Sequence, residues 1–334
     1  MANAIFFSVV IPLYNKRDGV LRAINSVLPQ LSSNDEVIVV DDGSTDGSAG
    51  MVEAHYSDVK ALRLFTQENM GVSAARNEGV RLARNDHVIL LDADDWWLDG
   101  ARKKMEELVR RWPNANAWSV GHYRADGETR VHIHSGLEED RLLEGADFVS
   151  HYAKYSGTIH SSSVCIRVRS FFDVGGCPVG ATSGEDVYLW LRLGLHGGIG
   201  VSPAPLVCID RSLGGTFDNK NRDDVGYHYR YFADRKKLDR LNREERIAIK
   251  GFLVRNGLRQ IAGSVASGNR SSGWKKAEVI GKVVPWFPLI GGAMLALPKR
   301  VFVWAFRRRH RLPKQVGYGS SEKPRPMGQF SLLR

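Results

Sequence analysis

Acidic and polar residues follow three short apolar runs in the first hundred residues. These segments read IPLYN at 11–15, VDDGSTDGS at 40–48 and LDADD at 91–95. If they meet at one edge of a sheet, their carboxylates repel one another unless a cation lies among them. Mg²⁺ and Mn²⁺ bind few carboxylates and complete their shell with substrate phosphates. The pattern therefore predicts a site where a divalent metal bridges the protein to an anionic ligand such as a nucleotide diphosphate.

Simpler explanations account for some of these acids. Asp46 alone is explained equally well as a helix cap. Asp94 or Asp95 would also be favoured by the dipole of a helix that begins there. These explanations do not account for Asp92 and the other strand ends together, so the metal interpretation is kept.

A second segment whose residues could take part in catalysis reads GEDVYLWLRL at 184–193. Asp186 stands at the start of a predicted helix, 185–196, whose apolar residues would anchor it to the core. A carboxylate held in this way can accept the proton of a hydroxyl nucleophile. On these residues alone, a helix N-terminus that favours Glu185 and Asp186 is the simpler interpretation.

The elements that must position these residues alternate between strand and helix. Apolar runs at 6–12, 36–42, 62–65 and 87–95 are separated by helical patterns at 19–28, 47–55 and 73–83. Strands of continuous hydrophobicity are buried on both faces. The carboxyl ends of parallel strands are where such sheets bind ligands. We predict an α/β fold, a Rossmann-like and mostly parallel sheet with helices on both faces.

The second half of the chain continues this sheet and then changes character. Further strands are predicted at 118–124, 129–136, 163–168 and 199–209. A polar-rich helical region follows at 230–266, then a linker at 267–273. The last twenty residues, rich in Gly, Ser, Pro and charge, are expected to be disordered.

The composition of the chain argues against several classes of protein. The 334 residues carry a formal net charge of +10, and three cysteines without CxxC spacing predict neither a disulfide framework nor a zinc site. We expect a cytoplasmic protein, whose apolar first residues form a strand and not a signal peptide. No nucleic-acid-binding motif accompanies the positive charge, so no nucleic acid partner is expected.

The charge is concentrated near the C-terminus, where 279–321 lacks Asp and Glu. The apolar run 283–297 is shorter than the roughly 20 residues that span a bilayer, and prolines and a glycine pair interrupt it. Aromatic residues beside a basic cluster are typical of the membrane interface. We predict that 282–311 binds the anionic cytoplasmic face of a membrane peripherally. A spanning helix or hairpin is the second choice, and a core helix with a solvated basic end stays open.

Five segments together resemble a known family. They are SVVIPLYN, VIVVDDGSTDGS, NMGVSAARNEG, HVILLDADDWW and TSGEDVYLWLRL, and they span roughly residues 6–215. In this order and spacing they resemble the family 2 glycosyltransferases. These have the GT-A fold and invert the anomeric configuration of the transferred sugar. The resemblance implies a catalytic domain at 1–225, followed by a helical extension and linker at 226–275. A membrane-associated segment at 276–311 and a disordered tail at 312–334 complete the expected organisation.

The resemblance also implies roles for single residues. Asp186 would be the catalytic base and Glu185 would bind the acceptor, while Asp94 and Asp95 would bind Mn²⁺ or Mg²⁺. The donor, with a UDP-sugar favoured, would be bound by Pro12, Tyr14, Asn15, Asp41, Asp42, Ser44, Arg76, Asn77 and Asp92. The acceptor would be a hydroxyl of a glycan or of a lipid-linked glycan, in cell-surface polysaccharide synthesis.

The chain departs from the family at one metal-shell position. Relatives often have a histidine there, whereas this chain has Leu213. Another group or water would then complete the metal shell, with His228 as a weak candidate. His132 and His134 are better explained as solvated surface residues than as metal ligands. A catalytically inactive family member that binds nucleotide-sugars or acts as a scaffold stays open. A phosphorelay receiver is disfavoured because it has no use for a second acidic strand end or for the GED segment.

Overall fold

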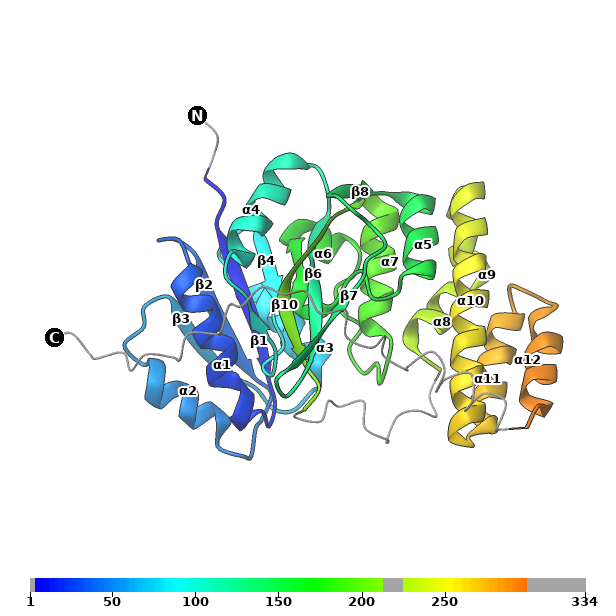
Figure 1. The fold of residues 1–334 in the computed structure, drawn as a ribbon, viewed down its shortest axis with the longest axis horizontal. Helices are drawn as coiled ribbons and strands as arrows, with labels where there is room; N and C mark the ends of the chain where they lie inside the picture. Colours follow the sequence, from blue (N-terminus) through cyan, green and yellow to red (C-terminus); the bar gives the residue numbers. More distant parts are fainter. Residues whose placement is uncertain (1–3, 213–224, 299–334) are drawn as a thin grey trace.

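The computed structural model describes residues 4–212 and 225–298. The ten strands within these ranges form one sheet in the order β3-β2-β1-β4-β9-β6-β10-β5, with β7 beside β6 and β8 beside β10 (Figure 1). The strands are β1 (Phe7–Leu13), β2 (Glu36–Asp41), β3 (Leu62–Thr66), β4 (His87–Leu90), β5 (Trp96–Trp97), β6 (Ala117–Asp126), β7 (Thr129–Ile133), β8 (Arg141–Leu143), β9 (Val164–Arg167) and β10 (Ile199–Asp210).

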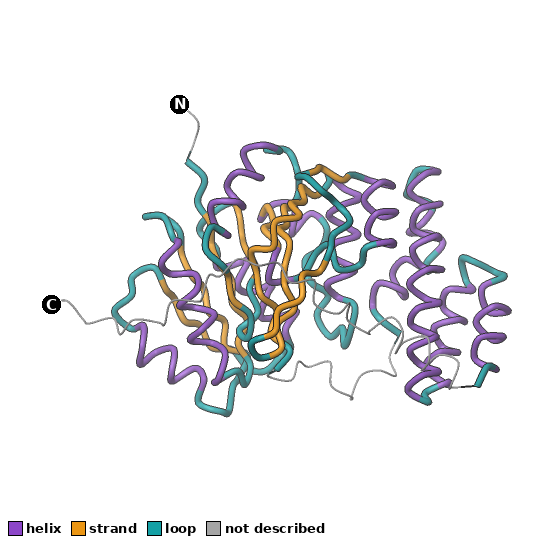
Figure 2. The backbone as a smooth tube through the Cα atoms, in the orientation of Figure 1, coloured by secondary structure: helices purple, strands orange, loops and turns teal. Residues whose placement is uncertain are grey.

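Helices cover both faces of this sheet (Figure 2). Those of the sheet region are α1 (Arg17–Val27), η1 (Leu28–Gln30), α2 (Ser48–Tyr56), α3 (Val72–Leu82), α4 (Ala101–Arg111), α5 (Gly145–Lys154), η2 (Ser161–Ser163), α6 (Val168–Asp173) and α7 (Glu185–Gly197). The C-terminal helices are α8 (Tyr227–Phe232), α9 (Arg235–Leu238), α10 (Arg243–Ser267), α11 (Arg270–Gly281) and α12 (Phe287–Ala296). The expected α/β class with a helical C-terminal extension is confirmed.

Strands β1 and β2 divide their side chains between two cores. In β2, Val37 and Val39 join the core that contains α1 and α4, whereas Ile38 and Val40 join the core that contains α3 and α7. All four residues are fully buried. This is why the strand patterns are continuously hydrophobic and do not alternate with polar residues.

The sheet is mixed, because the antiparallel strand β9 separates β1–β4 from the parallel pair β6 and β10. Strands β3, β2, β1 and β4 run parallel, as expected. Strand β9 is antiparallel to both β4 and β6. It follows directly on η2, whose Ser162 contacts the residues after β4, so β9 starts where β4 ends. A strand that starts there without a crossover connection has to run antiparallel to β4.

Two glycines allow helices to approach the sheet closely. A Cβ atom on Gly19 of α1 would lie 2.8 Å from the carbonyl oxygen of Ala93 and 2.9 Å from Cα of Asp94. A Cβ atom on Gly79 of α3 would lie 2.2 Å from Cγ1 of Val10 in β1. Both distances are shorter than side-chain contacts allow, so each helix is fixed at its present depth.

The C-terminal helices extend the core and do not form a separate one. Helix α10 packs against α5, and α11 and α12 pack against α10 at the end of the molecule opposite β3 (Figure 1). Phe252 and Phe287 are buried in the same cluster as residues of β1 and α7. The expected linker at 267–273 is a short break at Gly268 and Asn269, because the Asn269 side chain accepts a hydrogen bond from Ser272 and caps α11.

None of the helices described in this chain is both long enough and apolar enough to cross a membrane. The basic cluster that follows Pro298 and the tail predicted at 312–334 lie outside the described residues.

Candidate functional site

The three polar strand ends, two of which carry acids, meet at one edge, as the sequence predicted. Strands β2, β1 and β4 are parallel neighbours, so the loops that follow them lie side by side. The first two loops are joined by hydrogen bonds from Asn15 N to Ser44 Oγ (3.0 Å) and from Thr45 N to Asn15 Oδ1 (2.8 Å). Tyr14 is 48% exposed beside them. Pro12 is buried within β1, where it pairs with Val40 of β2.

Asp41 and Asp42 are both buried and organise the loops around them. Asp41 accepts a hydrogen bond from Ser44 N (3.1 Å). Asp42 accepts three, from Gln67 Nε2 (2.7 Å), Met70 N (2.9 Å) and Gly71 N (2.8 Å). The Asp42 carboxylate therefore fixes the loop that leads into α3.

Arg76 connects the acid after β4 to the start of α7. Its Nη2 donates to Asp92 Oδ1 at 2.7 Å, and its Nη1 lies 3.7 Å from Glu185 Oε1. Burial opposes ionisation of Asp92, but the charge of Arg76 is the main cause that holds the pKa of this carboxyl below its ordinary value. Burial and the charge of Asp186 raise the pKa of Glu185, and Arg76 acts against them.

Asp94 is paired with a lysine from the loop after β1. Lys16 Nζ lies 2.6 Å from Asp94 Oδ2, and the Asp94 side chain is 14% exposed. Arg22 Nη2 donates to the Asp94 carbonyl at 2.7 Å and also pairs with Asp210. These two cations hold the turn after β4 against α1, where Gly19 leaves room for it.

Asp95 is the one acid of this turn that is nearly inaccessible, at 2% exposure. It accepts hydrogen bonds from Ser162 Oγ and from Asp210 N (2.9 Å). Burial, followed by the charges of Asp92 and Asp94, raises the pKa of Asp95 well above its ordinary value. In the part of the chain that is described, no Lys or Arg forms an ion pair with this carboxylate.

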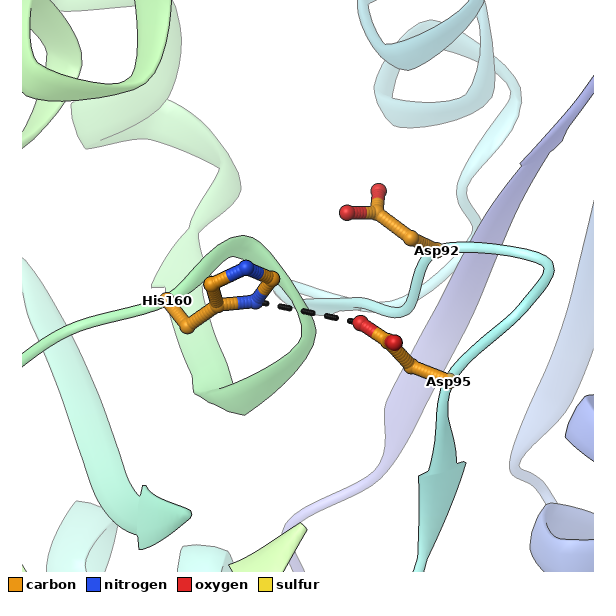
Figure 3. A group of neighbouring side chains, drawn as sticks. All are labelled: Asp92, Asp95 and His160. Carbon is orange, nitrogen blue, oxygen red and sulfur yellow. Dashed lines mark ion pairs between the residues drawn. The ribbon is translucent and has the colours of Figure 1, made fainter. Parts of the chain in front are cut away.

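His160 completes a group that could hold a metal ion. One ligand atom each from Asp92, Asp95 and His160 lies within 4.8 Å of the other two, and all three side chains point toward one space (Figure 3). His160 Nδ1 lies 3.8 Å from Asp95 Oδ2 and accepts a hydrogen bond from Ser162 N (3.3 Å). Burial lowers the pKa of His160 despite the charges of Asp92 and Asp186, which favours the neutral form of the imidazole.

Asp186 lies at the N-terminus of α7, as the sequence predicted, and faces the same region. Its charge acts on the pKa of His160, and on that of His228, whose pKa burial lowers to about 4. His228 is buried and belongs to no metal-ligand group among the residues described. Leu213 lies outside the described residues.

Asn77 holds the segment before α7. Its side chain donates to the carbonyl of Cys177 (2.8 Å) and accepts from the Cys177 amide (2.9 Å). Both hydrogen-bonding groups of the amide are thereby engaged with the backbone of the loop 177–184.

Sequence reasoning missed four residues that shape the site. Lys16 and Arg22 were missed because single cations in a helical pattern indicate nothing specific. Ser162 lies in η2 and His160 caps it, in a segment to which the sequence motifs assign no role. A single histidine before a run of serines carries no specific signal. His132 and His134 pack against each other outside this group, with ring centroids 4.5 Å apart.

Known proteins resemble this chain in sequence and in fold. Residues 8–171 match the model of Glycosyl transferase family 2. An uncharacterized glycosyltransferase of Rickettsia conorii is 28% identical over 229 residues, which cover 66% of this chain and 35% of that protein. TuaG of Bacillus subtilis, a provisionally assigned teichuronic acid biosynthesis glycosyltransferase, is 36% identical over 31% of this chain and 42% of TuaG. The chain thus spans about a third of the length of the Rickettsia protein.

The fold has a solved counterpart. The crystal structure of S. aureus TarS 1–349 in complex with UDP-GlcNAc matches with a TM-score of 0.69, covering 91% of this chain and 92% of that chain. The two chains are 18% identical, so the likeness concerns the fold.

Proposed function

This chain belongs to glycosyl transferase family 2, and we propose that it transfers a sugar from a nucleotide diphosphate sugar to a hydroxyl of a glycan acceptor, with inversion. The observation that carries the proposal is the Arg76 contact with both Asp92 and Glu185, since it joins a donor-side strand end to the helix that bears Asp186. Donor and acceptor groups would then meet in one site.

In the proposed reaction, the acceptor oxygen forms a bond to the anomeric carbon while the bond from that carbon to the diphosphate oxygen breaks. The bonding electron pair leaves with the nucleotide diphosphate, and the acceptor proton passes to the Asp186 carboxylate. Helix α7 is anchored by Leu189, Trp190 and Leu193, all buried. The base is therefore held on a packed element.

A divalent ion, when bound, would neutralise negative charge on the departing diphosphate. Two carboxylate oxygens and one neutral imidazole nitrogen are a donor set that suits Mn²⁺ or Mg²⁺ with water and phosphate completing the shell. Asp92, Asp95 and His160 would hold it, with Asp94 in the same turn.

A UDP-sugar is the proposed donor. Pro12, Tyr14, Asn15, Asp41, Asp42 and Ser44 would line the nucleoside pocket at the ends of β1 and β2, and Arg76 and Asn77 would support it from α3. The TarS structure, with the same fold, contains UDP-GlcNAc, which supports this choice. TuaG, with its teichuronic acid assignment, supports a place in cell-surface polysaccharide synthesis.

The test is a panel of nucleotide sugars assayed for hydrolysis and for transfer, with and without Mn²⁺, and with lipid-linked acceptors analysed by mass spectrometry. Metal-dependent release of one nucleotide diphosphate supports the proposal. Binding of a nucleotide-sugar without turnover by any acceptor would instead identify a catalytically inactive member that acts as a binding or scaffold protein.

We also propose that the C-terminal helices bind the anionic cytoplasmic face of a membrane. Helix α12 buries Phe287 and Leu295, while its Leu289 and Ile290 are 77% and 45% exposed and Trp286, just before the helix, is 50% exposed. An exposed apolar face beside basic residues is typical of an interfacial helix. Trp274 of α11, 45% exposed, lies against α12 next to the exposed Lys275. A lipid-linked acceptor would then lie at the same surface as the enzyme.

A further inference from the structure

Helix α8 lies between α7, which bears Asp186, and α10 of the C-terminal helices (Figure 1), and it packs against both. On the α10 side, the Tyr229 hydroxyl donates a hydrogen bond to Asn256 Oδ1. The centroid of the His228 ring lies 6.0 Å from that of Phe252. Tyr229 and Phe252 are both buried. Helix α8 therefore cannot move away from α7 without exposing apolar surface.

The His228 imidazole lies against the residue that begins α7. Gly184 is the N-cap of this helix, and a Cβ atom on it would lie 2.2 Å from His228 Nδ1 and 2.8 Å from His228 Cε1. A Cβ atom on Gly226 would lie 2.8 Å from the same Cε1. A side chain at either position would collide with the ring. The imidazole thus contacts the backbone two residues before Asp186.

Further contacts hold the chain on each side of Gly184. Tyr227 N donates a hydrogen bond to the Ser183 carbonyl at 2.8 Å. The Tyr227 and Tyr188 rings meet edge to face, with centroids 5.0 Å apart. Tyr188 N donates to the Gly184 carbonyl at 3.1 Å, within the first turn of α7. Helix α8 therefore determines where this turn lies, and with it the backbone that carries Asp186.

The His228 ring suits a supporting role because it is uncharged. Burial lowers the pKa of His228 to about 4, although the charge of Asp186 acts in the opposite direction. The imidazole is therefore neutral near pH 7. A cation beside a carboxylate favours its ionised form and so makes it a weaker proton acceptor. A neutral ring can support the helix without weakening Asp186 in this way.

We propose that His228 is a positioning residue for the transfer reaction. Through its contact with Gly184, it holds the first turn of α7 where the Asp186 carboxylate meets the acceptor hydroxyl. This inference rests on the proposed function, in which Asp186 is the base. It also gives the helices after residue 225 a direct part in the geometry of catalysis.

His228→Ala tests the proposal, because it removes the ring and leaves a space beside Gly184. We expect kcat to fall about tenfold or more, since small displacements of a reacting group are costly. The affinity for UDP, measured by calorimetry, should stay unchanged, because the proposed nucleoside pocket lies at the ends of β1 and β2. The matched control is His196→Ala, at an exposed position in the last turn of the same helix. Thermal melts verify that both variants are folded.

A double-mutant cycle with Gly184→Ala isolates the contact itself. Gly184→Ala alone should lose activity, because its methyl group meets the imidazole and because a φ of 73° is unfavourable for alanine. In the double variant the methyl group enters the space that the ring has left. The combined loss of kcat should therefore be smaller than the product of the two single losses. Losses that simply multiply would overturn the proposal.

Hydrogen exchange measures the same effect without a substrate. In His228→Ala, the backbone amides of 184–191 should exchange faster by on the order of tenfold, while those of α3 keep their rates. Unchanged exchange in 184–191, or faster exchange with unchanged kcat, would overturn the positioning role. An unaltered chain that transfers no sugar would instead reject the proposed function, and the exchange rates would still decide whether His228 holds α7.

Discussion

Arg76 and Glu185 are 109 residues apart in the sequence, yet the Arg76 Nη1 atom lies 3.7 Å from Glu185 Oε1. Arg76 is 5% exposed and also donates to Asp92. One guanidinium thus contacts two carboxylates with two different nitrogens. A lysine, with one nitrogen, cannot reproduce that geometry.

Arg76→Lys should keep the positive charge but lose the simultaneous contact with Asp92 and Glu185. We expect kcat/KM to fall about tenfold or more, because displacement of a positioning group by a fraction of an ångström is costly to catalysis. The unfolding temperature should change little. Arg81→Lys, on the exposed side of the same helix, is the control and should behave like the unaltered chain. Equal activity of the two variants would refute a positioning role for Arg76.

Arg76→Gln should change the pH dependence of the reaction. Burial and Asp186 raise the pKa of Glu185, while Arg76 lowers it. Removal of the positive charge therefore raises this pKa further, and Glu185 becomes protonated at a higher pH. The acid limb of the kcat/KM profile should move to higher pH. A limb that stays in place would show that Glu185 ionisation does not limit activity.

Asp186→Asn should abolish most transfer while leaving donor binding intact, because only the proton acceptor is changed. A loss on the order of a hundredfold or more is expected for removal of a general base. Steady-state kinetics and calorimetry with UDP measure the two properties separately. Near-normal turnover would exclude Asp186 as the base.

Asp94→Ala should weaken binding of a nucleotide diphosphate more in Mn²⁺ than in EDTA, if its role is metal-bridged. Lys16→Met is the companion variant, because Lys16 pairs with Asp94 at 2.6 Å. If Asp94 serves only to hold Lys16, both variants should lose the same affinity in both conditions. Calorimetry distinguishes the two patterns.

The membrane proposal is tested on the exposed face of α12. Leu289→Glu combined with Ile290→Glu should reduce flotation with anionic liposomes, and high salt should reduce the flotation of the unaltered chain. Both side chains are exposed, so the fold should persist. Ile247→Glu, at a 62% exposed position on α10, is the control. Equal flotation of both altered proteins would exclude this face as the anchor.

Much of the fold could be predicted because its local signals agree with its tertiary structure. The expected helix at 185–196 is α7 (Glu185–Gly197), and the expected strand at 199–209 is β10 (Ile199–Asp210). The convergence of Asp42 and Asp92 followed from parallel strands alone. The direction of β9 could not be predicted, because it depends on the contact of Ser162 with the turn after β4.

The site was predicted less completely, because pairing between distant residues leaves no local pattern. Nothing near Lys16 indicates that it meets Asp94, which is 78 residues away. The engagement of both groups of Asn77 with Cys177 likewise appears only in three dimensions. The residue types at strand ends predict where a reactive site can form. Which of these side chains remains available for catalysis depends on its hydrogen-bond and ion-pair partners, which are distant in the sequence.

The close contact between Gly79 and Val10 has a consequence for the chemistry some distance away. Arg76 lies one helical turn before Gly79 on α3, so the depth of that turn in the fold determines how far the guanidinium reaches toward Glu185. One added methyl group at Gly79 would have to displace the helix. Such a variant would resemble an active-site mutant in its kinetics although the added atom would first meet Val10, which is not a polar residue of the site. Substitutions that disturb the site are therefore not confined to its polar residues.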